Sequence, residues 1–124
     1  MKEITKAQED LLKALWEIKE GAVSDVLDSL PEPKPAYNTV ATVIKVLEKK
    51  GYVAHKTYGK THVYFPVITR KDYAQYVLKD TFKSLFNGSL NQLVSTFVKS
   101  KDISITELED LKEMLEKEII NKKQ

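Results

Sequence analysis

The chain of 124 residues contains no cysteine, which removes several kinds of chemistry at once. Disulfides, thiolate metal sites, thiol nucleophiles and cysteine redox switches are all excluded. The two histidines, His55 and His62, have no carboxylate at metal-binding spacing, and the four glycines form no phosphate-binding loop. We therefore expect no enzymatic activity, no cofactor and no bound metal.

A long apolar run is also absent. No stretch of the sequence is apolar enough to cross a membrane, and the start MKEITKAQEDLLKALWEIKE lacks the apolar region of a signal peptide. We expect a cytoplasmic protein without membrane insertion. Apolar residues at 42% and charged residues at 31% are typical of a folded globular chain.

Charges of the two signs are divided unevenly along the chain, although the formal net charge is only +2. Residues 34–71 contain eight lysines and arginines but a single acid, Glu48, which is a net charge of +7. Residues 102–118 contain seven acids and two lysines, a net charge of −5. We expect the basic segment to meet a polyanion and the acidic segment to lie away from it.

The first predicted helix spans residues 5–20. Thr5 and Gln8 have the spacing of a capping box, and apolar residues follow at helical intervals. Gly21 is predicted to end this helix. After a short extended piece, Ser24 is predicted to cap a short second helix.

A third helix is predicted after the proline-rich segment PEPKP, which cannot be helical. It begins at Pro35 or Ala36 and runs to Lys50, where Gly51 provides the stop. Helical spacing places its apolar residues on one side, so the opposite side must be polar.

The segment YVAHKTYGKTHVYFPV is rich in β-branched and aromatic residues, which predicts a β-hairpin. Alternation suggests that Val53 and His55 share a face with Val63 and Phe65. The connecting loop would then have an odd number of residues, centred near Gly59.

Three helices followed by a hairpin are typical of a winged helix-turn-helix domain, which we assign to residues 1–68. Residues 69–124 show three more helical patterns and are assigned to a helical dimerisation domain. The last of these helices is predicted to begin at a capping box of Thr106 and Glu109. The predicted fold is mostly α, of the α+β class.

The polar side of the third helix is suited to a major groove, because short polar side chains approach base edges and lysines reach phosphates. The residues expected to bind double-stranded DNA, on this helix and in the hairpin, are Lys34, Tyr37, Asn38, Thr39, Thr42, Lys45, Lys49, Lys56 and Lys60. Two alternatives remain: a surface that merely keeps the protein soluble, or a winged-helix interaction module that binds an acidic protein.

A homodimer is expected because three helices in about 55 residues have apolar stripes but little core of their own. The residues assigned to the dimer interface are Phe82, Phe86, Leu90, Leu93, Phe97, Leu108, Leu111 and Leu115. A two-fold dimer would bind a palindromic operator. The alternative is that these stripes pack on the winged domain of the same chain.

Three stretches, PAYNTVATVIKVLEKKGYV, YGKTHVYFPV and LNQLVSTFVKSKDISITELEDLKEMLEKE, together resemble the penicillinase-repressor family over nearly the whole chain. The resemblance implies a dimeric transcriptional repressor with a winged-helix domain on a palindromic operator. It also implies a membrane sensor-protease as a partner.

Two departures from the family pattern limit what the resemblance implies. Members that respond to β-lactams are cut at an Asn-Phe bond in the fifth helix, where this chain has Thr96 and Phe97. We interpret Phe97 first as part of an apolar stripe and keep the Thr96-Phe97 bond as an alternative proteolytic site. Members that respond to copper bind it through C-terminal cysteines, which this chain lacks.

Overall fold

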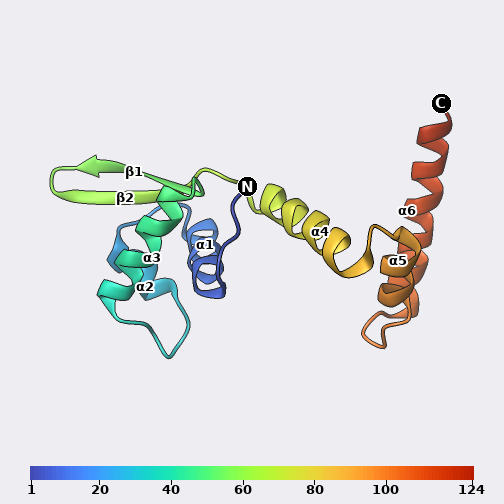
Figure 1. Cartoon of the computed structure of the whole chain (residues 1–124), viewed down its shortest axis with the longest axis horizontal. Coiled ribbons are helices and arrows are strands. Elements are labelled where there is room, and N and C mark those ends of the chain that lie inside the picture. The colour runs from blue at the N-terminus through green and yellow to red at the C-terminus, as the bar shows by residue number, and fades with distance from the viewer. The chain divides into compact units, whose positions relative to one another are not determined.

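Six helices and one two-stranded antiparallel sheet make up the computed structural model, which describes residues 1–124 (Figure 1). The chain divides into two compact units, residues 1–77 and residues 78–124. In the first unit, three helices are followed by a hairpin, as the sequence predicts. The unit boundary falls inside helix α4 (Arg70–Phe86), beyond the expected domain boundary at residue 68.

Helix α1 (Lys6–Ile18) begins at the predicted capping box. The backbone N–H of Gln8 donates to Thr5 Oγ1 at 3.2 Å, and the backbone N–H of Thr5 donates to Gln8 Oε1 at 3.0 Å. The helix ends earlier than predicted, because Lys19 adopts a left-handed φ of 76° and its N–H returns to Leu15 O. Gly21 therefore does not end the helix.

Gly21 instead joins the sheet. Its N–H and C=O exchange hydrogen bonds of 2.9 Å and 2.8 Å with the backbone of Tyr64. A side chain could not be accommodated at this position, because a Cβ on Gly21 would lie 2.8 Å from the Cβ of Asp25. The glycine thus leaves room for the side chain of Asp25 in the first turn of α2 while its backbone pairs with Tyr64 of the hairpin.

Helix α2 (Val23–Ser29) begins two residues earlier than predicted, because its cap is Ala22 and not Ser24. The carboxylate of Asp25 accepts a hydrogen bond of 2.9 Å from the backbone N–H of Ala22, so an acidic side chain in the first turn stabilises the start. The helix ends before the prolines, as expected.

Helix α3 (Tyr37–Lys49) places its apolar stripe toward the core, as predicted. Val40, Ile44 and Leu47 are fully buried against α1 and α2, and Val43 is half-buried at the edge. This packing fixes the rotation of α3 about its axis, so the opposite side faces solvent.

The hairpin consists of β1 (Val53–Tyr58) and β2 (Thr61–Pro66), and its predicted register is wrong. His55 lies opposite Tyr64, and Tyr58 lies opposite Thr61, so the loop is the two-residue Gly59-Lys60 turn. Gly59 has a φ of +62°, which allows this tight turn in place of an odd-numbered loop.

Tyr73, near the start of α4, extends the core of the first unit to residue 77. Its ring lies 5.8 Å from that of Trp16 and 6.0 Å from that of Tyr52, measured between centroids. The indole N–H of Trp16 donates to Ile68 O at 2.9 Å, which holds the segment between β2 and α4. The start of α4 therefore belongs to the winged-helix unit.

The second unit contains the remainder of α4, α5 (Leu90–Val98) and α6 (Ile105–Lys123). Helix α6 begins two residues earlier than predicted, because the capping box is formed by Ser104 and Glu107. No residue between 78 and 124 is buried. None of the six helices has the length and apolar character needed to cross a membrane.

We predict that the hydrogen bond from the Tyr73 hydroxyl to Glu9 Oε2, at 2.6 Å, stabilises the first unit in a pH-dependent way. This bond is the main cause that lowers the pKa of Glu9 below its ordinary value of 4.5. A lowered carboxyl pKa in the folded state stabilises the fold above about pH 4.5, and this stability is lost as the pH falls through the folded-state pKa.

Tyr73→Phe should therefore lower the free energy of unfolding by about 1–2 kcal/mol at pH 7 and by clearly less at pH 3. Urea denaturation at both pH values measures the difference, with Tyr76→Phe on the same helix as the control. An equal loss at the two pH values would show that the bond to the carboxylate is not the cause.

Candidate nucleic-acid interface

The exposed side of α3 carries the polar residues that the sequence predicts there. Asn38, Thr39, Thr42, Lys45 and Lys49 are all exposed. The Thr42 hydroxyl donates to the carbonyl of Asn38 at 2.9 Å, so its proton is used within the helix. Its oxygen lone pairs and its methyl group remain for an external contact.

Lys34, in the loop before α3, has partners within the protein. Its ammonium donates to Asp28 O at 2.7 Å and to Leu27 O at 3.4 Å. These carbonyls lie in the last turn of α2, where a cation is favourable. Lys34 thus joins the proline-containing loop to α2, an arrangement that the sequence did not predict. Tyr37, at the first position of α3, is exposed.

The hairpin carries the other predicted cations. The ammonium of Lys56 lies 5.3 Å from the ring centroid of Phe65, a cation–π contact that keeps the side chain along the strand. Lys60 lies in the turn next to Gly59 and is exposed. In Figure 1 the turn forms the end of the hairpin that extends past the helices of this unit.

Glu48, the one acid among residues 34–71, is paired at the junction of α3 and β1. Its Oε2 lies 2.5 Å from Nδ1 of His55. Burial raises the pKa of Tyr64, on the neighbouring strand, and the negative charge of Glu48 raises it further. Sequence reasoning missed this pair, although a lone acid in a basic segment, seven residues before a histidine, is a signal that could have suggested it.

The two histidines do approach each other across the hairpin. Their ring centroids are 4.4 Å apart, and Nδ1 of His62 lies 3.0 Å from the Thr57 hydroxyl. Contrary to the sequence analysis, a carboxylate is near them, because Glu48 contacts His55. No group of three or more side chains of the histidine, aspartate and glutamate types is placed to hold a metal ion.

The predicted interface residues of the second unit remain accessible. Phe82, Phe86, Leu93, Leu108 and Leu111 are half-buried, whereas Leu90, Phe97 and Leu115 are at least half exposed. Thr96 and Phe97 lie inside α5, and the Thr96 hydroxyl donates to Gln92 O at 2.9 Å. The bond between them is therefore part of a regular helix.

Known proteins share this organisation. The family model described as penicillinase repressor matches residues 4–117. The chain belongs to the penicillinase-repressor family. Membership makes it a transcriptional repressor and not an enzyme.

Two relatives in this family show similar identity over nearly their full length. The methicillin resistance regulatory protein MecI of Staphylococcus aureus (strain N315) is 27% identical over 116 residues, which cover 93% of this chain and 94% of MecI. The penicillinase repressor of Bacillus licheniformis is 27% identical over 123 residues, covering 98% of this chain and 96% of the relative.

A solved structure agrees with the fold. The crystal structure of a possible transcriptional regulator for arsenical resistance aligns with a TM-score of 0.50 and 20% identity, covering 73% of this chain and 88% of that one. The predicted winged-helix fold is thereby confirmed.

We predict that Lys34 stabilises the end of α2. Lys34→Met keeps most of the side chain but removes the ammonium, so the free energy of unfolding should fall by roughly 0.3–1 kcal/mol at low salt. Lys45→Met, on the exposed side of α3, serves as the matched control and should change it less. Equal effects of the two changes, measured by urea denaturation, would argue against the capping contact.

Proposed function

We propose that this repressor binds an inverted-repeat operator as a homodimer, with α3 in the major groove and the hairpin on the adjacent backbone. The observation that carries the proposal is the exposed side of α3, which combines short polar side chains with lysines. In the same unit, the hairpin presents further cations at its turn.

The two ends of α3 suit different parts of the DNA. Asn38 and Thr42, near the first turns, offer an amide, a hydroxyl oxygen and a methyl group, which match the edges of adenine and thymine. Lys45 and Lys49 lie further along the helix, where a lysine reaches phosphates. We therefore assign discrimination between sequences to the first group and affinity to the second.

The excess of cations around Glu48 supports a polyanion as the partner. An unpaired carboxylate beside the basic surface would repel phosphates over about 10 Å at moderate salt. The contact with His55 places a hydrogen-bond donor or a cation against this carboxylate. The eight lysines and arginines of residues 34–71 outnumber this single acid, so the segment keeps a net attraction for DNA.

A second copy of the chain is the partner proposed for the helical unit. Its residues include large apolar side chains that are mostly exposed, such as Leu85 at 72%, Leu90 at 64% and Phe97 at 59%. Pairing two such surfaces would remove them from water and contributes about 25 cal/mol for each Å² of apolar area buried. A two-fold pair would also present two α3 helices to the two halves of an inverted repeat.

The membrane sensor-protease implied by the family resemblance would act on α5. The Thr96-Phe97 bond lies within this helix, so cleavage there would require α5 to open locally. Cutting α5 would separate α6 from the rest of the proposed dimer interface and weaken the dimer.

We predict that Thr42→Ala lowers the preference for the operator over random DNA by about tenfold, because it removes a contact to a base edge. Lys60→Ala should weaken binding to both DNAs equally and reduce the salt slope by about 0.9, because it removes one phosphate contact. Fluorescence anisotropy with both duplexes at several salt concentrations measures each change. Equal losses on both DNAs for Thr42→Ala would remove this residue from base recognition.

Binding to the DNA upstream of its own gene separates the proposal from an acidic protein partner. At near-physiological salt this DNA should be bound at least about 1,000-fold more tightly than a scrambled duplex. If the two duplexes bind alike, the repressor does not recognise an operator in this region, and the interaction-module alternative gains support.

We predict that truncation after Val77 yields a folded monomer that retains Tyr73 and its core contacts. Its operator affinity should fall at least about 100-fold, since the second half-site is no longer linked. Light scattering measures the dimer, and anisotropy measures the affinity. A truncated protein that is still dimeric would contradict the assignment.

A point change tests the same surface in the full chain. Leu90→Glu should weaken the dimer, because Leu90 belongs to the proposed interface. Ile105→Glu is the matched control, since Ile105 is 76% exposed but lies outside the proposed set. Equal weakening by both changes would indicate a general effect of charge on the second unit.

A further inference from the structure

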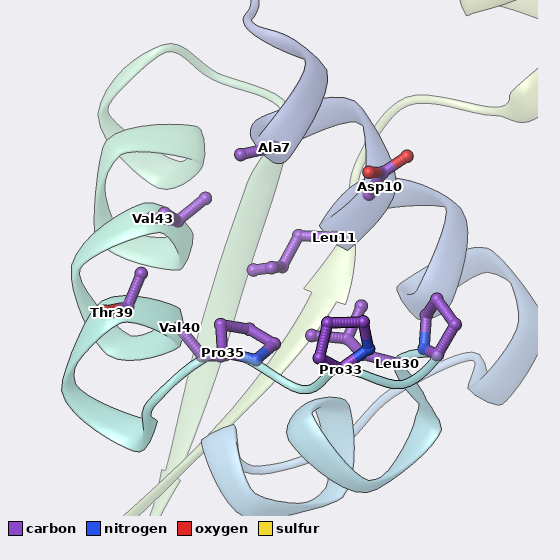
Figure 2. A pocket seen from close by; sticks show the side chains of 10 residues that line it. Ala7, Asp10, Leu11, Leu30, Pro33, Pro35, Thr39, Val40 and Val43 are labelled. Carbon is purple, nitrogen blue, oxygen red and sulfur yellow. The ribbon is translucent and has the colours of Figure 1, made fainter.

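A small cavity lies between the beginning of α1, the proline-containing loop and the first turns of α3 (Figure 2). Its volume is about 170 Å³. All its walls belong to the first compact unit. Its lining includes Ala7 and Leu11 from α1, Leu30 and Pro33 from the loop, and Thr39 and Val43 from α3.

The lining of the cavity is mostly apolar. Leu11, Leu30 and Val40 are buried at its base, and three prolines form its exposed rim. In Figure 2 the carboxylate of Asp10 points away from α3. It is also paired with the ammonium of Lys6 at 3.0 Å, so the one charged residue of the lining has a partner.

We propose that this cavity binds a neutral molecule with a single aromatic ring. An enclosed apolar cavity of about 150 Å³ in another protein takes up benzene. The volume here is similar, but the pocket opens to solvent beside Ala7, Thr39 and the prolines, so one ring would fit with one edge exposed. Prolines present rigid, flat faces to a planar ligand, and their fixed backbone loses little freedom when the site is filled. Thr39 provides one hydroxyl at the edge, which suits a ligand with a single polar group.

The location of the cavity connects it with α3. Thr39 and Val43 are on this helix, and Ala7 and Leu11 face them from α1. A bound ring would fix the distance between α1 and α3, because packed helices do not deform freely. The cavity is therefore an effector site, a role that rests on the proposed operator binding.

Phenol is the probe for binding to the free protein. Amide chemical shifts measured by NMR should change in α1, the proline loop and α3, and they should saturate with a dissociation constant on the order of 1 mM. Cyclohexanol and benzoate should bind at least threefold more weakly, since the first lacks the flat ring and the second carries a charge. Shifts that do not saturate, or equal binding of cyclohexanol, would overturn the proposal.

Two cavity-filling changes and one control test the location. Ala7→Leu and Val43→Ile should each weaken phenol binding at least threefold, because they occupy the space from opposite walls. Ala74→Leu, an exposed position on α4, should leave it unchanged. If phenol binds both cavity-filling variants as tightly as it binds the unaltered protein, then it binds elsewhere and the site is refuted.

Operator affinity with and without saturating phenol tests the effector role separately. A change of at least twofold is expected in the unaltered protein and should be absent in Ala7→Leu. An unchanged affinity while phenol is bound rules out the effector role and leaves the binding site standing. If the operator is not recognised even without phenol, the proposed function fails and the binding measurement is unaffected.

Discussion

The packing of α3 against α1 and α2 is the interaction on which the rest of the winged-helix unit depends. Val40, Ile44 and Leu47 are completely buried, and the burial of each contributes about 1.5–3 kcal/mol. Because these side chains can be buried in only one rotation of the helix, the position of the opposite side follows. Asn38 and Thr42 face solvent as a consequence of this packing, and the hydrogen bond from the Thr42 hydroxyl to Asn38 O is made within the helix itself.

A second set of contacts holds the hairpin beside this helix. Gly21 pairs with Tyr64, Glu48 contacts His55, and the Trp16 indole holds the backbone of Ile68. Each contact joins the hairpin or the segment after it to a helix or to the turn between α1 and α2, so the proposed DNA-binding residues of the helix and the hairpin belong to one compact unit. The helical unit differs, because none of residues 78–124 is buried, which supports the proposed pairing with a second copy.

Much of this organisation could be predicted from local patterns. The capping box at Thr5, the proline break and the apolar stripe of α3 involve residues within a few positions of one another. Predictions failed where several local solutions were equally good. Ser24 has the side chain of a cap, but Asp25 accepts the hydrogen bond from the backbone N–H of Ala22. In the last helix the cap is Ser104 and not the predicted Thr106. Family membership follows from a pattern spread over the whole chain, so it too could be recognised from sequence.

By itself, the sequence determined the order of the helices and the hairpin, the polar side of α3 and the separation of basic from acidic segments, because helical period and charge are local properties. Only the tertiary structure decided the hairpin register, the role of Gly21, the contact between Glu48 and His55, and the cavity beside Thr39. These features depend on residues far apart in the chain or on the angle of a turn. Such features are selected by packing, which no local pattern records.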